Sequence, residues 1–192
     1  MKILLVAATN QEIKKDLFSS KDILITGVGM LNTTLNLTAK LSSTNYDLVI
    51  NMGVAGSFNS DIKIGNVVEV VEDIFSEIGF QNGESFSEFI NFEVKNTFVV
   101  DGRTNLKKVK GITVNTVHGN EDSIHKIIDR LNPDIESMEG AAVFMVCNNF
   151  SIPCIQIRSI SNKVEKRNTE NWNLPLAIEN LNSEVEQIIS EL

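Results

Sequence analysis

Two glutamates and an asparagine stand directly after apolar runs of this 192-residue chain, and side chains at such positions often meet at one end of a sheet. Glu12 lies in AATNQEI, Glu139 in ESMEGAA, and Asn162 ends the segment RSISN. A carboxylate can orient a water molecule or accept hydroxyl hydrogen bonds, and an amide can donate as well as accept. These residue types are compatible with a catalytic site for a small polar ligand.

Each carboxylate also has an ordinary structural interpretation, because a negative charge suits the first turn of a helix. Glu12 fits that role in a short helix, and Glu139 fits it at the start of a later one. The residues after Glu139 are small and apolar, so we expect its helix to be buried, where a carboxylate needs a partner. A sugar diol is a natural partner, since one carboxylate can accept two hydroxyl hydrogen bonds.

Two glycine-containing loops, GVGMLN and NMGVAGSF, include Gly29, Asn32, Gly53 and Val54. Glycines allow the backbone to approach a ligand closely, and successive amides can hold an anion or a water molecule. Simple tight turns would use the same residues. GVGMLN lacks the third glycine of the dinucleotide fingerprint, and no suitable acidic residue ends the second predicted strand, so the sequence argues against NAD.

The segment RSISN follows the mostly apolar run IPCIQI. Arg158 should therefore lie deep in the protein and need a carboxylate or several carbonyl groups as partners. Asn162 should face the end of the sheet. An amide stands there in a place where an acid would be the obvious catalyst.

Other kinds of chemistry find little support in the sequence. His118 and His125 are seven residues apart and match no zinc pattern, so we expect no metal and no cofactor. No serine or cysteine lies in a nucleophile elbow. Cys147 and Cys154 fit no ligand spacing and are interpreted as buried free thiols.

Composition restricts the possible partners. The net charge of −8 argues against nucleic acid and anionic membranes, which need a basic surface. The first apolar run has about seven residues, too few for a signal peptide or a membrane helix, and we expect a cytoplasmic protein.

The chain is expected to form one α/β domain over residues 1–192, an α/β/α sandwich with a mixed central sheet. Strands and helices alternate at both ends, around a middle that is rich in strands. Helices are predicted at residues 10–18, 30–43, 121–131, 138–150 and 171–192. Strands are predicted at residues 2–7, 22–29, 46–58, 65–75, 96–100, 111–118, 134–137 and 152–160.

Taken together, the motifs resemble the superfamily of purine nucleosidases and nucleoside phosphorylases. KILLVAATNQEI is similar to the first strand and catalytic-glutamate turn of the methylthioadenosine/S-adenosylhomocysteine nucleosidases, and the two glycine loops, ESMEGAA and RSISN follow in the same order. The resemblance is weaker between about residues 60 and 110. Within the superfamily, SISN followed by KVEKRNTENW is most similar to futalosine hydrolases, which release hypoxanthine from futalosine in a menaquinone pathway.

The resemblance implies a role for each motif. Glu12 would activate the attacking water, while Glu139 and the backbone of Met138 would bind the ribose. Gly53 and Val54 would line the pocket, and Gly29, Asn32 and Arg158 would support it. Asp122 and Ile124 are further candidates for the edge and face of the purine.

Asn162 departs from the adenine-directed relatives, which have an aspartate at that place. Adenine carries an amino group at position 6, whereas hypoxanthine carries a carbonyl group, which a carboxylate would repel. Asparagine can donate to N7 or O6 of hypoxanthine. Binding of the wrong base would be disfavoured, because it would leave buried polar groups unpaired. The asparagine therefore predicts a 6-oxopurine leaving group.

Other functions stay open at the level of sequence: an adenine-directed nucleosidase, a purine nucleoside phosphorylase, or a purine-binding module without catalysis. The resemblance also implies a homodimer or larger homo-oligomer, in which EFINF (residues 88–92) could complete a neighbour's pocket or pack in the core. Lys163, Lys166 and Arg167 are cations near the motif in sequence, but none can be assigned to the carboxylate of futalosine.

Overall fold

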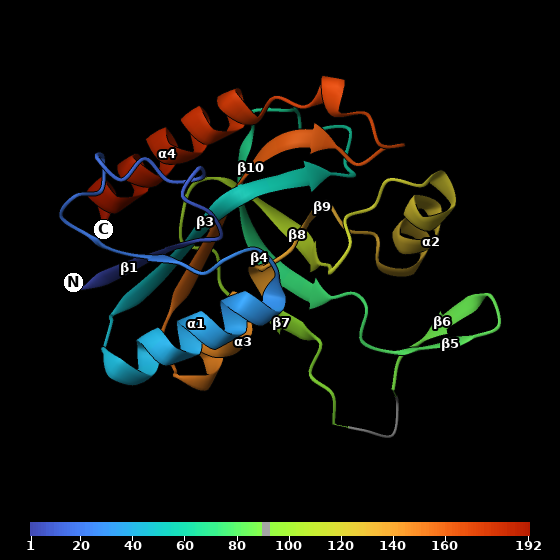
Figure 1. Cartoon of the computed structure of the whole chain (residues 1–192), viewed down its shortest axis with the longest axis horizontal. Coiled ribbons are helices and arrows are strands. Elements are labelled where there is room, and N and C mark those ends of the chain that lie inside the picture. The colour runs from blue at the N-terminus through green and yellow to red at the C-terminus, as the bar shows by residue number, and fades with distance from the viewer. Residues whose placement is uncertain (90–92) are drawn as a thin grey trace.

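The computed structural model describes residues 1–89 and 93–192, and Figure 1 shows an α/β fold with helices on both sides of a mixed sheet. The predicted α/β/α architecture is confirmed. Strand order in the sheet is β10-β4-β8-β9-β3-β1-β2, with β7 paired to β4. The strands of this sheet are β1 (Ile3–Ala7), β2 (Asp22–Ile25), β3 (Leu48–Ser57), β4 (Val67–Phe75), β7 (Thr97–Val99), β8 (Lys107–Thr113), β9 (Ile135–Ser137) and β10 (Cys154–Lys163).

Strand β10 joins the two halves of the sheet, because it pairs parallel with β3 and antiparallel with β4. The pairings β4–β8, β8–β9 and β9–β3 complete a closed ring of five strands. Strands β1, β3 and β10 run parallel, so their carboxyl ends lie at one edge. A site can form at that edge because the loops after these strands meet there.

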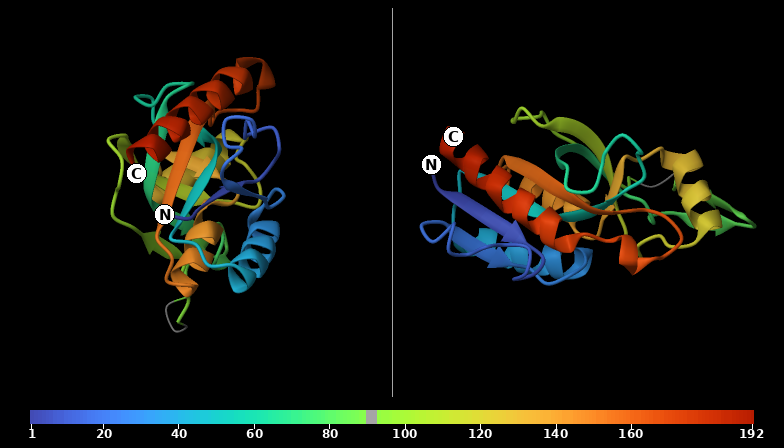
Figure 2. Two further views of the ribbon diagram at one scale, coloured as in Figure 1. Left: turned by 90° about the vertical axis from the view of Figure 1, so that its left-hand side faces the viewer. Right: turned by 90° about the horizontal axis from the view of Figure 1, so that it is seen from above.

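Two layers of helices cover the sheet, as Figure 2 shows. On one face lie α1 (Met30–Ser43) and α3 (Gly140–Asn149), and on the other lies α4 (Leu174–Glu191). Buried Ala177, Leu181, Val185 and Ile188 recur at helical spacing along α4 and pack its inner face. Leu176, in the first turn of α4, is 41% exposed.

The remaining elements lie away from this sandwich. Helix α2 (Glu121–Leu131) stands at one end of the molecule, near a separate hairpin of β5 (Phe80–Asn82) and β6 (Ser85–Ser87). A short 3-10 helix, η1 (Thr169–Asn171), precedes α4. Cys147 and Cys154 are free and buried, as the sequence indicates.

The helix predicted over residues 10–18 is wrong, because the segment forms a series of turns. Asn182 of α4 bonds this segment in place of helical hydrogen bonds: its Oδ1 accepts from the amide of Lys14 at 2.8 Å and its Nδ2 donates to the carbonyl of Glu12 at 3.0 Å. Tertiary hydrogen bonds from a buried side chain thus override local helix propensity.

A buried polar network fixes the start of α3. Asp73 of β4 accepts hydrogen bonds from Thr113 Oγ1 at 2.9 Å and from Gln156 Nε2 at 2.7 Å. Thr113 Oγ1 accepts from the amide of Ala141 at 2.7 Å, in the first turn of α3. A methyl group on Gly140 would lie 2.1 Å from Asp73 Oδ2, so only glycine fits there. Burial raises the pKa of Asp73 to about 6.

The raised pKa of Asp73 predicts a pH-dependent stability. The folded protein keeps a proton that the unfolded chain releases near the ordinary value of 3.8, so this stabilisation is lost as the pH rises through about 6. Asp73→Asn should therefore gain stability relative to wild type between pH 4 and pH 8, by at most about 3 kcal/mol at 1.36 kcal/mol per pKa unit. Urea unfolding of both proteins across this range measures the difference, and a difference independent of pH would contradict the prediction.

Candidate active site

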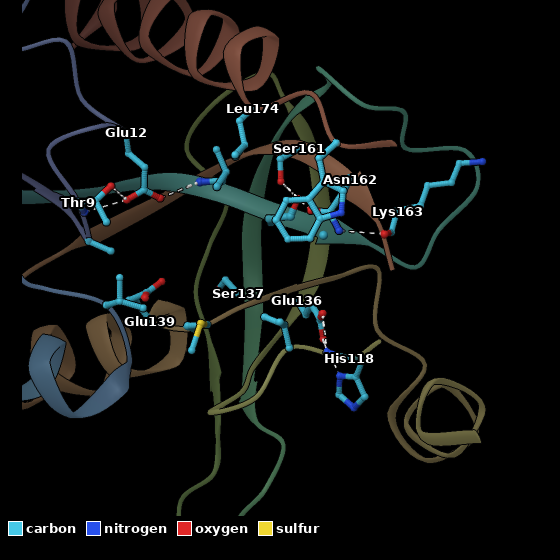
Figure 3. Close-up of a pocket in the computed structure, with 18 of the residues that line it drawn as sticks. Thr9, Glu12, His118, Glu136, Ser137, Glu139, Ser161, Asn162, Lys163 and Leu174 are labelled. Atoms are coloured by element: carbon cyan, nitrogen blue, oxygen red, sulfur yellow. Dashed lines mark hydrogen bonds and ion pairs between the residues drawn. The ribbon is translucent and has the colours of Figure 1, made fainter. Parts of the chain in front are cut away.

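A cavity of about 460 Å³ opens where β1, β3, β9 and β10 end (Figure 3). Five residues expected from the sequence line it, namely Glu12, Val54, Met138, Glu139 and Asn162. They come from four separate segments of the chain, which the sheet brings together. The cavity is therefore the candidate active site.

Glu12 is held by the loops after β1 and β3. Its Oε2 accepts hydrogen bonds from Thr9 N at 2.9 Å and Thr9 Oγ1 at 3.0 Å, and its Oε1 accepts from Val54 N at 3.2 Å. A methyl group on Gly53 would approach Glu12 Oε1 to 2.9 Å and Arg158 Nη1 to 3.2 Å. Gly53 thus leaves room for the carboxylate, which three donors hold in one orientation.

Glu139 stands at the amino end of α3 and bridges to the loop before α1. Its Oε1 accepts a hydrogen bond from Gly29 N at 2.8 Å. Gly29 has φ +92°, a backbone conformation that favours glycine. Burial raises the pKa of Glu139, while the amide of Gly29 and the charge of Arg158 act in the opposite direction. One carboxylate oxygen is therefore anchored and the other can accept hydrogen bonds from a ligand.

The expected supporting residues lie outside the cavity wall. Asn32 donates to the carbonyl of Val28 at 2.8 Å and so stabilises its own loop. Arg158 is 1% exposed; it donates to Asn51 Oδ1 at 2.5 Å and to the carbonyl of Ile157 at 3.2 Å. Within the described chain, no carboxylate forms an ion pair with Arg158. Its predicted depth is correct, and its partners are an amide oxygen and one carbonyl group.

Asn162 enters the cavity at a bulge in β10. The register with β3 shifts between Ile160 and Asn162, which re-aims the side chain. Its Oδ1 accepts from Ser161 Oγ at 2.8 Å, and its Nδ2 donates to the carbonyl of Lys163 at 2.9 Å. A carbonyl group can only accept, so the amide nitrogen must face Lys163 and the amide orientation is fixed. One further N–H remains for a ligand.

Three residues expected in the cavity wall, Gly53, Asp122 and Ile124, are not part of it. Asp122 and Ile124 belong to α2, and neither lines the cavity wall. The amide of Asp122 is bonded instead to the capping side chain of Asn120, at 3.0 Å. Val117 and His118, from the loop that leads to α2, line the cavity in their place.

The segment 163–172 contributes several side chains to the cavity wall, which its sequence alone did not indicate. Lys163, Arg167 and Trp172 all line the wall, and the Arg167 guanidinium lies 5.1 Å from the centre of the Trp172 ring. Lys166 is not part of the lining. The segment between β10 and α4 therefore adds two cations and an aromatic surface.

His118 and Glu136 form a pair that sequence reasoning left unassigned. His118 Nδ1 lies 2.6 Å from Glu136 Oε2, and both residues line the cavity. They are eighteen positions apart in the sequence, and the parallel pairing of β8 with β9 brings the loop after β8, which carries His118, beside Glu136.

Metal and membrane features can be assessed for residues 1–89 and 93–192. Over these ranges, no three His, Cys, Asp or Glu side chains are grouped to hold a metal ion. None of the helices described is long and apolar enough to cross a membrane. The segment EFINF, expected near a neighbour's pocket, lies partly outside the described residues.

The sequence matches a family model described as the phosphorylase superfamily over residues 22–190. The 5′-methylthioadenosine/S-adenosylhomocysteine nucleosidase of Marinomonas sp. (strain MWYL1) is 26% identical over 190 residues, covering 90% of this chain and 82% of the relative. The aminodeoxyfutalosine nucleosidase of Helicobacter pylori (strain ATCC 700392 / 26695) is 21% identical over 169 residues, covering 79% of this chain and 72% of the relative.

Solved structures share the whole fold. A variant of the Helicobacter pylori methylthioadenosine nucleosidase, with 5′-methylthioadenosine in its active site, superposes with a TM-score of 0.87 at 20% identity and covers 100% of this chain and 99% of its own. The futalosine hydrolase of Helicobacter pylori strain 26695 gives a TM-score of 0.86 at 18% identity, covering 100% and 98%. At such identities the likeness concerns the fold.

Proposed function

We propose, from the premise that this chain belongs to the phosphorylase superfamily, that it is an N-ribosyl hydrolase which cleaves futalosine and releases hypoxanthine. The broader class is a nucleosidase that hydrolyses N-glycosyl bonds, the activity that its relatives carry in their names. The finer assignment rests on one observation, the fixed orientation of the Asn162 amide in the cavity.

The Asn162 amide presents a hydrogen-bond donor to the ligand. Its oxygen is engaged by Ser161 and one amide hydrogen by Lys163, which leaves the second amide hydrogen for the cavity. A donor complements N7 or O6 of a 6-oxopurine and stabilises the charge that develops on the departing base. Because an oxopurine anion is a better leaving group than adenine, hydrogen bonding can replace full protonation at this position.

The sugar end of the cavity would be formed by the two anchored glutamates. Glu139 has one oxygen on Gly29 and would bind the ribose hydroxyls with the other, beside the backbone of Met138. Its negative charge would also stabilise the oxocarbenium-like sugar of the transition state. Glu12, held by Thr9 and Val54, would orient the attacking water and accept its proton.

The charge distribution favours water over phosphate as the nucleophile. Figure 3 shows Lys163 far from Glu12, at the opposite side of the cavity. Arg167 comes from the segment after β10, and Arg158 lies beneath the wall with 1% exposure. A phosphate beside Glu12 would meet a carboxylate without a cation from the cavity wall to balance it. Lys163 and Arg167 are instead the candidate partners for the carboxylate of futalosine.

An adenine-directed nucleosidase is the second candidate, and a specific finding favours it. Relatives named 5′-methylthioadenosine/S-adenosylhomocysteine nucleosidase match at 25–28% identity, whereas the two named aminodeoxyfutalosine nucleosidase match at 21%. Overall similarity therefore favours that activity, and the donor at Asn162 favours a 6-oxopurine.

One substrate panel separates these functions. Purified protein is incubated with futalosine, inosine, methylthioadenosine or adenosylhomocysteine, with and without phosphate, and the released base is identified by chromatography. We expect hypoxanthine from futalosine at a rate independent of phosphate. Release of adenine but never hypoxanthine would refute the futalosine assignment, and a requirement for phosphate would refute hydrolysis.

Asn162→Asp tests the leaving-group role of the amide. A carboxylate there would face the carbonyl of Lys163 and the oxygen of a 6-oxopurine. A polar group of the bound base left without its hydrogen bond costs about 1–3 kcal/mol. Hypoxanthine release from futalosine should fall at least about tenfold in kcat/KM. Unchanged kcat/KM in a folded variant would remove Asn162 from the mechanism.

Glu12→Gln tests water activation. Glutamine keeps an oxygen that can accept from the amide of Val54, but it cannot take a proton from water. We expect kcat to fall by about 10²–10⁴-fold, the usual contribution of a general base. Binding of hypoxanthine, followed by calorimetry, should stay within about threefold of wild type, because Glu12 lies at the sugar end. Retained turnover would exclude Glu12 as the base.

A further inference from the structure

Three residues lie side by side across the sheet at one end of the cavity. Glu136 of β9 pairs with Gly56 of β3, and Gly56 pairs in turn with Asn162 of β10. Paired residues on neighbouring strands project from the same face, about 4.8 Å apart from strand to strand. The carboxylate and the amide therefore flank one glycine.

Gly56 leaves the space between these two side chains open. A methyl group on this residue would lie 3.1 Å from Asn162 Nδ2, 3.6 Å from Glu136 Cγ and 2.9 Å from Val164 Cγ2. Glu136 and Asn162 both line the cavity, so they form one polar edge of it. This edge offers an acceptor on one side and a donor on the other.

Glu136 is held in place by His118. Its Oε1 accepts from the His118 amide at 3.0 Å, and its Oε2 accepts from the same amide at 3.4 Å and pairs with His118 Nδ1 at 2.6 Å (Figure 3). Each carboxylate oxygen has two lone pairs, so Oε1, with one donor, keeps capacity for a ligand. Glu136 is only 4% exposed, and a carboxylate buried to this degree needs such partners.

We propose that Glu136 is a specificity-determining residue that accepts the N1 hydrogen of a 6-oxopurine, while Asn162 donates to the neighbouring O6. His118 is a positioning residue that acts through Glu136. This inference rests on the proposed function. The edge of adenine has the opposite pattern, with an acceptor at N1 and a donor at position 6, so the same pair of side chains would leave adenine unsatisfied.

The test compares the binding of two free bases to wild type and to two variants of the whole chain. Hypoxanthine and adenine are titrated calorimetrically into wild type, Glu136→Gln and His118→Phe at one pH and salt concentration. Glu136→Gln places a donor opposite N1, so the ratio of hypoxanthine to adenine affinity should fall at least about tenfold, as expected for one buried hydrogen bond. His118→Phe keeps a ring beside Phe58 and should lower the ratio several-fold.

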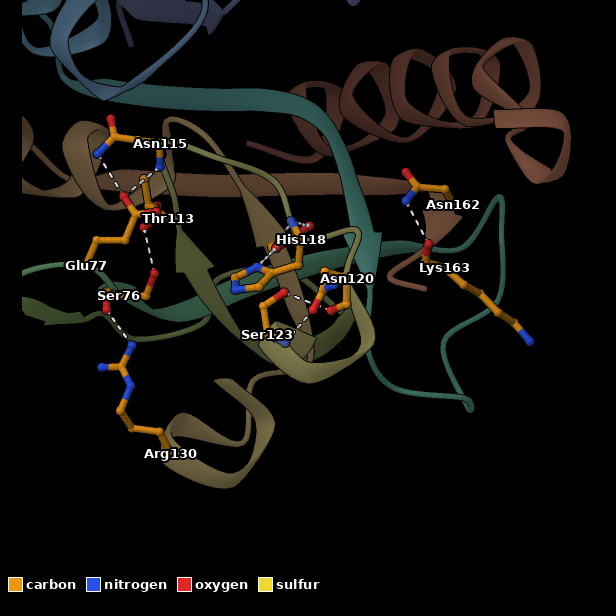
Figure 4. Close-up of polar contacts among 11 residues, drawn as sticks. Ser76, Glu77, Thr113, Asn115, His118, Asn120, Ser123, Arg130, Asn162 and Lys163 are labelled. Carbon is orange, nitrogen blue, oxygen red and sulfur yellow. Dashed lines mark hydrogen bonds and ion pairs between the residues drawn. The ribbon is translucent and has the colours of Figure 1, made fainter. Parts of the chain in front are cut away.

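Glu77→Gln is the matched control. Glu77 holds the same loop in the same way, since it accepts from the amide and the side chain of Asn115 at 2.9 and 2.8 Å, but it does not line the cavity (Figure 4). Its substitution tests whether loop anchoring alone sets base preference. The affinity ratio of this variant should stay within about twofold of wild type, well below the effect of one buried hydrogen bond.

The outcomes separate this inference from the proposed function. If wild type prefers hypoxanthine and Glu136→Gln keeps that ratio, or weakens both bases equally, the role of Glu136 is refuted. An equal shift in Glu77→Gln also refutes it. If wild type itself binds adenine more tightly than hypoxanthine, the proposed futalosine activity is refuted, independently of the role of Glu136. Should Glu136→Gln not fold, an unchanged ratio in His118→Phe refutes the positioning of Glu136.

Discussion

The candidate site depends on the absence of two side chains in one strand. At Gly53 and Gly56 of β3, candidate site residues from neighbouring segments occupy the space that a side chain would need. A methyl group on Gly53 would meet Glu12 and Arg158, and one on Gly56 would meet Asn162 and Val164. Side chains from β9, β10 and the loop after β1 therefore pack against the backbone of β3 at these two glycines.

Burial of charge is the second constraint, and Arg158 partly balances it. This guanidinium is almost fully buried, and its charge lowers the pKa of Asp73 and of Glu139 against the opposing effect of desolvation. None of the ion pairs of the described residues includes it, so its effect on these carboxylates acts over a distance. Asp73 in turn fixes the start of α3, directly after Glu139. The proposed sugar end is therefore supported by buried polar groups that do not line the cavity.

Sequence reasoning was most successful where local pattern and strand ends decide the outcome. The α/β architecture followed from alternating apolar runs, and Glu12, Val54, Met138, Glu139 and Asn162 lie in one cavity as their positions after these runs indicate. Long-range pairing explains the failures. Residues 10–18 form turns in place of the predicted helix, and Asn182 hydrogen-bonds this segment from α4. The register of β9 with β3 brings Glu136 beside the cavity. No local spacing of residues encodes either contact.

The two ends of the cavity differ in how they are built, and this difference bears on specificity. Backbone amides of Thr9, Gly29 and Val54 hold the two glutamates of the proposed sugar end, so changing that end would require changes in the chain path. The proposed base end is formed by the side chains of Glu136 and Asn162, in register over a glycine. Substitutions there alter donors and acceptors without altering the strands. Under the proposed function, the sugar end could therefore stay unchanged while substitutions of two side chains changed the base that is released.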